Sequence, residues 1–152
     1  MWLDTRNGYL GFWYYSYKSW IYRSVCKKTH GNSIEISLFK YPKDAIDAIK
    51  KNPPDVLGLS NYSWNSLLSE RIANIAKLEN PRVVTVQGGP NFPHGTEQQL
   101  EFLNKRPNTD LHIMFEGEAT FSNLLDRVLK DRKGKQKLLD TPIDGCVFIH
   151  PD

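Results

Sequence analysis

The hydrophobic positions of the chain form three short continuous runs that recur at similar intervals. They occupy residues 55–60 (DVLGLS), 82–87 (RVVTVQ) and 110–115 (DLHIMF). A continuous apolar run of this length is typical of a strand that is buried on both faces of a sheet. A fourth run, residues 33–39, alternates apolar and polar positions, which predicts a less buried or edge strand.

Segments with helical periodicity separate these strands. Apolar residues recur at intervals of three and four in residues 43–51, 66–79, 96–104 and 120–132. Regular alternation of strand and helix predicts an α/β fold, in which helices cover both faces of a mostly parallel sheet. The expected architecture is therefore a three-layer α/β/α sandwich.

The N-terminal segment departs from this alternation because it is rich in aromatic residues. We predict the first helix over residues 9–28, and only Met1-Trp2-Leu3 precedes it as apolar material. The first strand is therefore expected to be short or missing, unless the chain begins partway into a natural domain. Three parts are predicted: an aromatic-rich segment with the first helix (1–32), an α/β core (33–132), and a basic linker with a terminal strand (133–152).

The composition indicates a globular protein of one domain. The chain has 152 residues, of which 39% are hydrophobic and 24% are charged, with a net charge of +3. No apolar run reaches the roughly 18 residues of a membrane span, and no signal peptide is visible. Two cysteines are too few for a disulfide framework or a multi-cysteine metal site, so we expect a reduced, cytoplasmic protein.

One basic run, residues 130–137, follows the last predicted helix. Basic side chains are favoured at the carboxyl end of a helix, where they complement its dipole. We interpret the run as a solvated helix end, and we expect neither a nucleic-acid nor a membrane partner.

Polar loops follow the three predicted buried strands. Their sequences are Ser60-Asn61-Tyr62-Ser63-Trp64-Asn65, Gln87-Gly88-Gly89-Pro90-Asn91 and Glu116-Gly117-Glu118-Ala119-Thr120. Ligands of open α/β sheets bind outside the carboxyl ends of the strands, so these loops are expected to form one cleft. Each loop also has a purely structural explanation: serine caps helices, Gly-Gly-Pro makes turns, and Glu118 complements a helix dipole.

The order of these motifs resembles the cobalamin-binding domain found at the N-terminus of many radical S-adenosylmethionine enzymes. The resemblance rests on PDVLGLSNYSWN, VQGGPNF and FEGEATF, and it runs from about residue 33 to about residue 129. It implies a flavodoxin-like (Rossmann-like) fold with cobalamin as its cofactor. It also implies a radical S-adenosylmethionine catalytic domain as partner, in cis or in trans, to which the four-iron cluster and S-adenosylmethionine would be confined.

The resemblance assigns roles to individual residues. Ser60 and Asn61 are similar to the loop beneath the corrin, and Tyr62, Trp64 and Asn65 to its flank. Gly88, Gly89 and Pro90, with Asn91 in the same loop, look like the close approach to the nucleotide tail. Glu116, Gly117 and Glu118 look like the closing loop. Glycine would serve there because a bulky cofactor needs backbone without a Cβ in its way.

The sequence also departs from relatives of this fold. Cobalamin domains of the methionine-synthase type carry Asp-x-His-x-x-Gly before the serine loop, whereas residues 13–18 here read WYYSYK. The cobalt would then have no histidine ligand from this motif, and the cofactor would bind base-off. The cluster motif Cys-x-x-x-Cys-x-x-Cys is missing, because Cys26 and Cys146 lie 120 positions apart. We therefore expect no catalysis by this chain alone.

The four histidines offer no obvious replacement for that ligand. His30 lies at a predicted helix end and His150 in the tail, and His112 is expected to be a hydrogen-bonded core residue. His94 lies on the loop side of the sheet and is a weaker candidate for touching the cofactor.

Two alternatives stay open. The chain could be a degenerate interaction or scaffold domain that no longer binds cobalamin, which a missing first strand would favour. A nucleotide-binding enzyme is disfavoured, because neither Gly-x-Gly-x-x-Gly nor a P-loop pattern follows any strand.

Overall fold

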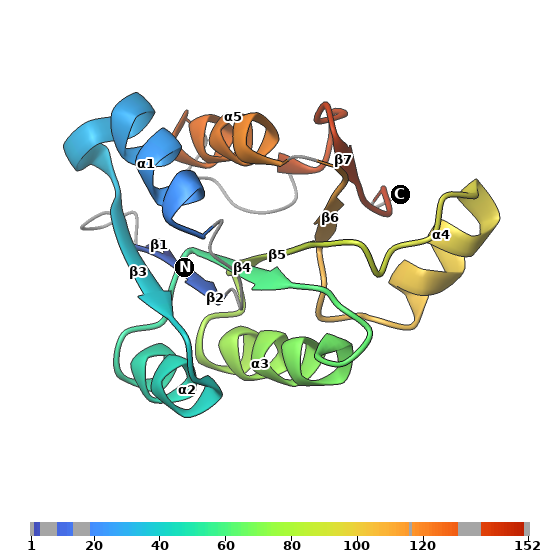
Figure 1. Ribbon diagram of the computed structural model, residues 1–152, viewed down its shortest axis with the longest axis horizontal. Coiled ribbons are helices and arrows are strands. Elements are labelled where there is room, and N and C mark those ends of the chain that lie inside the picture. Colours follow the sequence, from blue (N-terminus) through green and yellow to red (C-terminus); the bar gives the residue numbers. More distant parts are fainter. Residues whose placement is uncertain (1, 4–8, 14–18, 116, 131–137, 151–152) are drawn as a thin grey trace.

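The computed structural model of the chain describes residues 2–3, 9–13, 19–115, 117–130 and 138–150. Within them a twisted sheet is sandwiched between helices (Figure 1). The strands are β1 (Trp2–Leu3), β2 (Tyr9–Trp13), β3 (Glu35–Phe39), β4 (Val56–Ser60), β5 (Val84–Gly88), β6 (Leu111–Ile113) and β7 (Cys146–Val147). The helices are α1 (Ser19–His30), α2 (Pro42–Lys51), α3 (Ser66–Glu79), α4 (Thr96–Asn104) and α5 (Glu118–Lys130), with a 3-10 turn at Gly31–Ser33.

The described strands follow the order β3-β2-β1-β4-β5-β6-β7, and β2 also pairs directly with β4. Five strands, β3, β2, β4, β5 and β6, run parallel to one another. The short β1 and β7 are antiparallel to their neighbours. The prediction of a mostly parallel sheet is confirmed, and β3 lies at the edge as its alternating sequence indicated.

The predicted first helix over residues 9–28 is wrong in its first part. Tyr9–Trp13 form a five-residue strand, and the helix begins only at Ser19. The first strand, β1, is short as expected. The strand that the prediction missed is β2, which pairs with both β3 and β4 inside the sheet. Aromatic residues favour strands more than helices, and YLGFW is a continuous apolar run like the sequences of β4, β5 and β6. The predicted helix therefore began too early, because the aromatic residues at its start belong to a strand.

Each face of the sheet packs against its own pair of helices. Figure 1 shows α1 and α5 on one side and α2 and α3 on the other, with α4 beside this stack. Along β4, Val56 joins the core beneath α5, while Leu57 and Leu59 join the core against α3. Successive residues of a strand point to opposite faces, so one buried strand supplies both cores.

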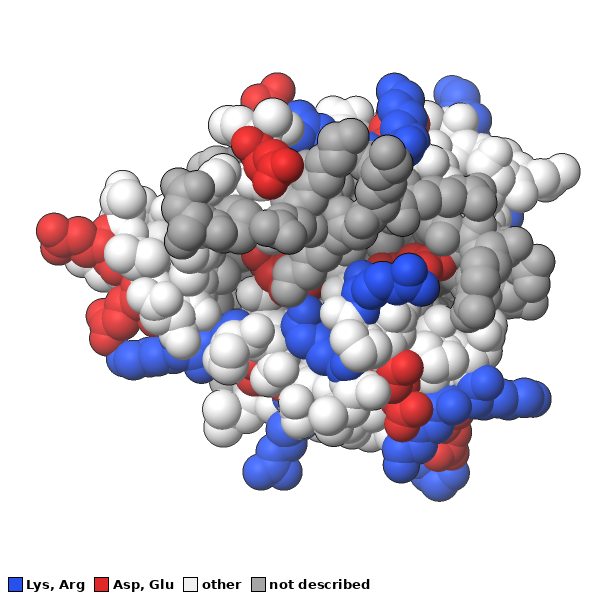
Figure 2. All heavy atoms as spheres, turned by 180° about the vertical axis from the view of Figure 1, so that it is seen from behind, with Lys and Arg blue, Asp and Glu red and all other residues white. Residues whose placement is uncertain are grey.

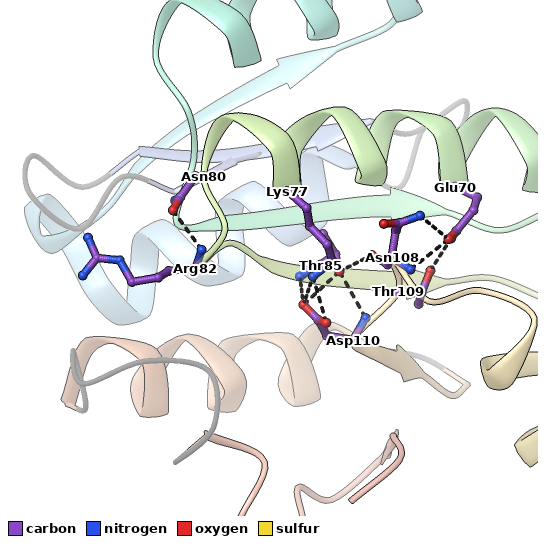
Figure 3. Close-up of polar contacts among 8 residues, drawn as sticks. All are labelled: Glu70, Lys77, Asn80, Arg82, Thr85, Asn108, Thr109 and Asp110. Atoms are coloured by element: carbon purple, nitrogen blue, oxygen red, sulfur yellow. Dashed lines mark hydrogen bonds and ion pairs between the residues drawn. The ribbon is translucent and has the colours of Figure 1, made fainter. Parts of the chain in front are cut away.

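A buried polar network joins α3 to the amino ends of β5 and β6 (Figure 3). Asp110 accepts hydrogen bonds from the backbone N–H and the hydroxyl of Thr85, each at 2.9 Å. Lys77 of α3 donates to both Asp110 oxygens at 2.8–2.9 Å. Glu70, seven residues before Lys77 on the same helix, accepts hydrogen bonds from Asn108 and Thr109. The network fixes the connection that leads into β6.

Charges on the visible rear face are mixed in sign: Figure 2 shows basic and acidic side chains interspersed on it. Most of the basic run, residues 131–137, lies outside the described residues. In the part of the chain that the structure describes, no helix is both long and apolar enough to cross a membrane.

Candidate functional site

The three polar loops leave the sheet at the same edge. Ser60 of β4 is in register with Gly88 of β5, and Gly88 is in register with Ile113 of β6. Because these strands are parallel, their carboxyl ends lie side by side. We call the edge formed by residues 60–65, 87–91, 114–115 and 117–118 the carboxyl rim. The sequence predicted that these segments would come together, and the register agrees.

The first loop of the rim is built on buried polar side chains. Ser60 and Asn65 are 1% and 7% exposed, and Asn65 Nδ2 donates to Ser60 Oγ at 2.7 Å. Asn65 Oδ1 in turn accepts the backbone N–H of Tyr62 at 2.8 Å. Ser69 of α3 donates its hydroxyl to the Ser60 carbonyl at 2.8 Å. Ser60 therefore shapes the loop and does not cap α3, whose N-cap position is Asn65.

Two aromatic residues of this loop form a flat outward surface. The rings of Tyr62 and Trp64 stack with centroids 4.6 Å apart and planes 15° apart. Trp64 is 74% exposed, and Leu67 in the first turn of α3 is 81% exposed. Tyr62 is half-buried and supports the exposed Trp64 ring, which offers an apolar contact area to a planar ligand.

The second loop is tied to the first through Asn61, which is fully buried. Its backbone N–H donates to the Gly88 carbonyl at 2.7 Å, and its carbonyl accepts the Asn91 N–H at 3.2 Å. Its side-chain Nδ2 donates to the Asn91 carbonyl at 2.6 Å. Asn61 and Asn91 therefore hold the rim together and face one another across it.

The two glycines of the second loop have different reasons to be glycine. Gly89 has φ +136°, and a Cβ there would lie 2.6 Å from the Asn61 carbonyl oxygen. Its bare backbone is required by the protein itself. A Cβ on Gly88 would meet nothing nearer than 3.8 Å, at the Ile113 carbonyl oxygen. The described protein therefore gives no steric reason for glycine at position 88.

This difference predicts unequal effects of alanine at the two positions. Gly89→Ala should lower the free energy of unfolding by about 1–3 kcal/mol, since it forces a strained φ and a backbone overlap. Gly88→Ala, its matched control, should cost well under about 1 kcal/mol, because its Cβ makes ordinary contacts in a strand. Urea unfolding of the two variants measures this, and equal losses would contradict it.

The third loop is only partly described, because Glu116 lies outside the described residues. Gly117 is buried, and its carbonyl accepts the Phe121 N–H at 2.7 Å at the start of α5. Glu118 is the first residue of α5, where a carboxylate complements the helix dipole. Phe115, with φ 57° and 86% exposure, is a rim residue that the sequence analysis missed. A phenylalanine at the end of an apolar run is normally predicted to be a core residue, so the sequence pattern did not indicate that Phe115 is exposed.

A hollow of about 540 Å³ adjoins the second loop, between it and α4. Its lining residues come from the loop, from α4 and from the two residues after α4: Pro90, Asn91, Phe92, Pro93, Gln98, Glu101, Phe102, Lys105 and Arg106. Pro90 and Asn91 belong to both the hollow and the carboxyl rim, so the two are continuous. The other wall of the hollow is formed by residues outside the loop motifs, which is why the motifs did not predict it.

The expectation that His112 is hydrogen-bonded is wrong. It is fully buried, yet neither ring nitrogen has a hydrogen-bond partner among the described residues. Burial, together with a smaller effect of the positive charge of Arg106, lowers the pKa of its imidazole to about 3. His112 is therefore neutral at physiological pH.

The other candidate metal ligands are not grouped. His30 is buried against Ser122 of α5, with Nε2 and Oγ 3.1 Å apart, and His94 is exposed on the loop between β5 and α4. Burial raises the pKa of both cysteine thiols, Cys26 and Cys146, to about 12, which disfavours the thiolate. Across the described ranges, no three His, Cys, Asp or Glu side chains are placed to hold a metal ion.

The parallel sheet and the loops at its carboxyl rim define an α/β cofactor-binding domain. A family model described as the B12 binding domain matches residues 24–125. The chain belongs to this family, and its flavodoxin-like fold agrees with the prediction.

The individual relatives that match the chain include methyltransferases and a cyclase. The chain is 38% identical over 78 residues, 51% of its length, to the cobalamin-dependent radical SAM methyltransferase TokK of Streptomyces tokunonensis. It is 32% identical over 98 residues (61%) to the 2-(S-pantetheinyl)-carbapenam-3-carboxylate methyltransferase of Streptantibioticus cattleyicolor. It is 31% identical over 99 residues (65%) to the anaerobic magnesium-protoporphyrin IX monomethyl ester cyclase of Rubrivivax gelatinosus. The matches span only 11–17% of the length of these curated relatives.

Proposed function

We propose that this chain binds cobalamin at its carboxyl rim and presents it to a radical S-adenosylmethionine catalytic domain, in cis or in trans. The corrin would lie over Ser60 and Asn61, flanked by Trp64, and the nucleotide tail would approach Gly88. Bound cobalamin would supply a centre for alkyl transfer, which no side chain of this chain offers. Methyl transfer is the favoured reaction of the whole enzyme, because two of the relatives above are named methyltransferases.

The observation that carries the proposal is the bare backbone of Gly88. It ends β5 in the middle of the rim, between the ends of β4 and β6, and the described protein leaves room for a Cβ there. A flat ligand lying on the rim explains why a side chain would be unfavourable at this position. The exposed Tyr62–Trp64 stack beside it supplies an apolar wall for the same ligand.

The residues present support binding without a histidine below the cobalt. Residues 14–18, which follow β2 in the sequence, read YYSYK and include no histidine. Of the four histidines, His30 and His112 are buried in the cores on opposite faces of the sheet. We therefore propose base-off binding with no protein ligand from residues 14–18.

The scaffold alternative has lost its main argument. It depended on a missing first strand, and β2 has the same length as β4 and β5.

Titration of the full 152-residue chain with hydroxocobalamin, followed by gel filtration and an absorption spectrum, tests the proposal. We expect the cofactor to elute with the protein, with a base-off spectrum that lacks a histidine-bound form. Gly88→Val should abolish co-elution, and Trp64→Ala should weaken it at least several-fold. Leu78→Ala is the matched control, since Leu78 is also 74% exposed but lies at the far end of α3. Colourless wild-type protein would refute the proposal.

A further inference from the structure

Two buried polar side chains lie side by side just below the carboxyl rim. Gln87 of β5 and His112 of β6 occupy paired positions of adjacent strands, and both are 0% exposed. They point to the face of the sheet opposite the core formed by Val84, Val86 and Ile113. Gln87 directly precedes Gly88, so the pair lies one residue below the proposed cofactor site on the carboxyl rim.

None of the four polar atoms of this pair has a hydrogen-bond partner among the described residues. They are Oε1 and Nε2 of Gln87 and both ring nitrogens of His112. Buried polar atoms are hydrogen-bonded in the great majority of native structures, and leaving them unpaired is destabilising. Thr85, two residues earlier on the same face, shows the usual situation, because Asp110 accepts its hydroxyl hydrogen.

A layer of aromatic rings separates this pair from the hollow beside the rim. The Phe92 ring stacks on the His112 imidazole with centroids 3.9 Å apart and planes 16° apart. Phe102 packs edge-on against Phe92 at 5.1 Å, and both phenylalanines line the hollow. Arg106 covers Phe102, with its guanidinium carbon 3.5 Å from the ring centre. One side chain, Phe92, therefore touches both His112 and the hollow.

The chemistry of the pair selects an uncharged partner. A neutral imidazole offers one donor and one acceptor, and the Gln87 amide offers both kinds of group. Two neutral groups in a buried site cannot compensate a carboxylate or an ammonium, whose desolvation is costly. A carboxamide both donates and accepts, so it complements the pair without a charge.

We propose that Gln87 and His112 bind one of the peripheral carboxamide arms of the cofactor, which enters through the hollow as Phe92 turns away from His112. This rests on the proposed cobalamin binding. The corrin ring carries such arms around its edge, and an arm is small enough to enter a hollow that begins at Pro90 while the ring stays on the rim. The pair would thus be unsatisfied in the free protein and satisfied in the complex.

The test compares stability without cofactor and affinity for cobalamin in Gln87→Met and His112→Leu. Each variant should unfold at the same or a higher urea concentration than the wild type without cofactor. Each should bind hydroxocobalamin about tenfold more weakly, the loss expected for a hydrogen-bonded group. Thr85→Val is the matched control on the same strand and face: it should lose stability and keep its affinity.

A second probe identifies the group on the cofactor. Cobalamin monoacids, in which one peripheral amide is hydrolysed to a carboxylate, should include an isomer that the wild type binds at least tenfold more weakly than cobalamin. Gln87→Met should not make this distinction. If both variants lose stability as Thr85→Val does and keep wild-type affinity, the pair is satisfied internally and the inference fails while cobalamin binding stands. If the wild type binds no cobalamin, both proposals fail.

Discussion

Replacing Asp110 with alanine is expected to lower the free energy of unfolding by about 3–5 kcal/mol, because it breaks a buried charge pair. The Asp110 side chain is 3% exposed and the Lys77 side chain 16%. Its removal leaves the Lys77 ammonium in a largely buried site without its counterion, and it leaves the Thr85 N–H without this acceptor. Urea unfolding followed by circular dichroism gives the loss directly.

The exposed ion pair of α2 provides the control for this substitution. Lys43 Nζ lies 2.6 Å from Asp47, with side chains 83% and 59% exposed, so solvent screens their attraction. Asp47→Ala should therefore change the midpoint of unfolding little. If Asp110→Ala and Asp47→Ala have similar effects, the network of Figure 3 does not stabilise the fold.

Acidification should destabilise the protein through His112. The pKa of this imidazole falls from 6.5 to about 3 on folding, mainly because it is buried. Between these values the unfolded chain binds the proton and the folded chain does not, so stability is complete above about pH 6.5 and falls as the pH is lowered. The slope is about 1.4 kcal/mol per pH unit, or about 2 kcal/mol between pH 6.5 and 5.

The measurement is urea unfolding at pH 6.5 and pH 5 for the wild type and for His112→Leu. Other titrating groups are common to both proteins, so the difference between their two losses isolates His112. The wild type should lose about 2 kcal/mol more than the variant over this range. Equal losses would mean that the imidazole takes up its proton in the folded state as it does in the unfolded chain.

The pattern of short apolar runs was sufficient to predict the central strands and most helices. The predicted helix over residues 66–79 coincides with α3, and that over 96–104 coincides with α4. The apolar residues of these elements recur with a clear period because one face or both faces are buried, so the sequence pattern predicts the element. The N-terminal segment was not predicted correctly, because the continuous apolar run of Tyr9–Trp13 has no periodicity that distinguishes a strand from a helix.

The candidate site was predictable to the extent that it depends on the ends of parallel strands. Any strand that runs parallel to β4 must end at the same edge, so the segments after β4, β5 and β6 had to meet. The roles within those loops were not predictable in the same way. Ser60 and Ser63 both satisfied the preference for helix caps, yet Asn65 occupies the N-cap position and Ser60 accepts its side-chain hydrogen bond.

The sequence by itself determined the α/β alternation, the positions of the rim loops and the resemblance to cobalamin-binding domains, because these depend on local periodicity and on short motifs. Only the tertiary structure decided that Gly89 must be glycine because of the Asn61 backbone, while a Cβ at Gly88 would make only ordinary contacts. Only it placed Phe92 over His112 and beside the hollow, since β5, β6 and α4 contribute from separate parts of the chain. Such features depend on contacts between distant segments, and no periodicity or motif along the chain encodes them.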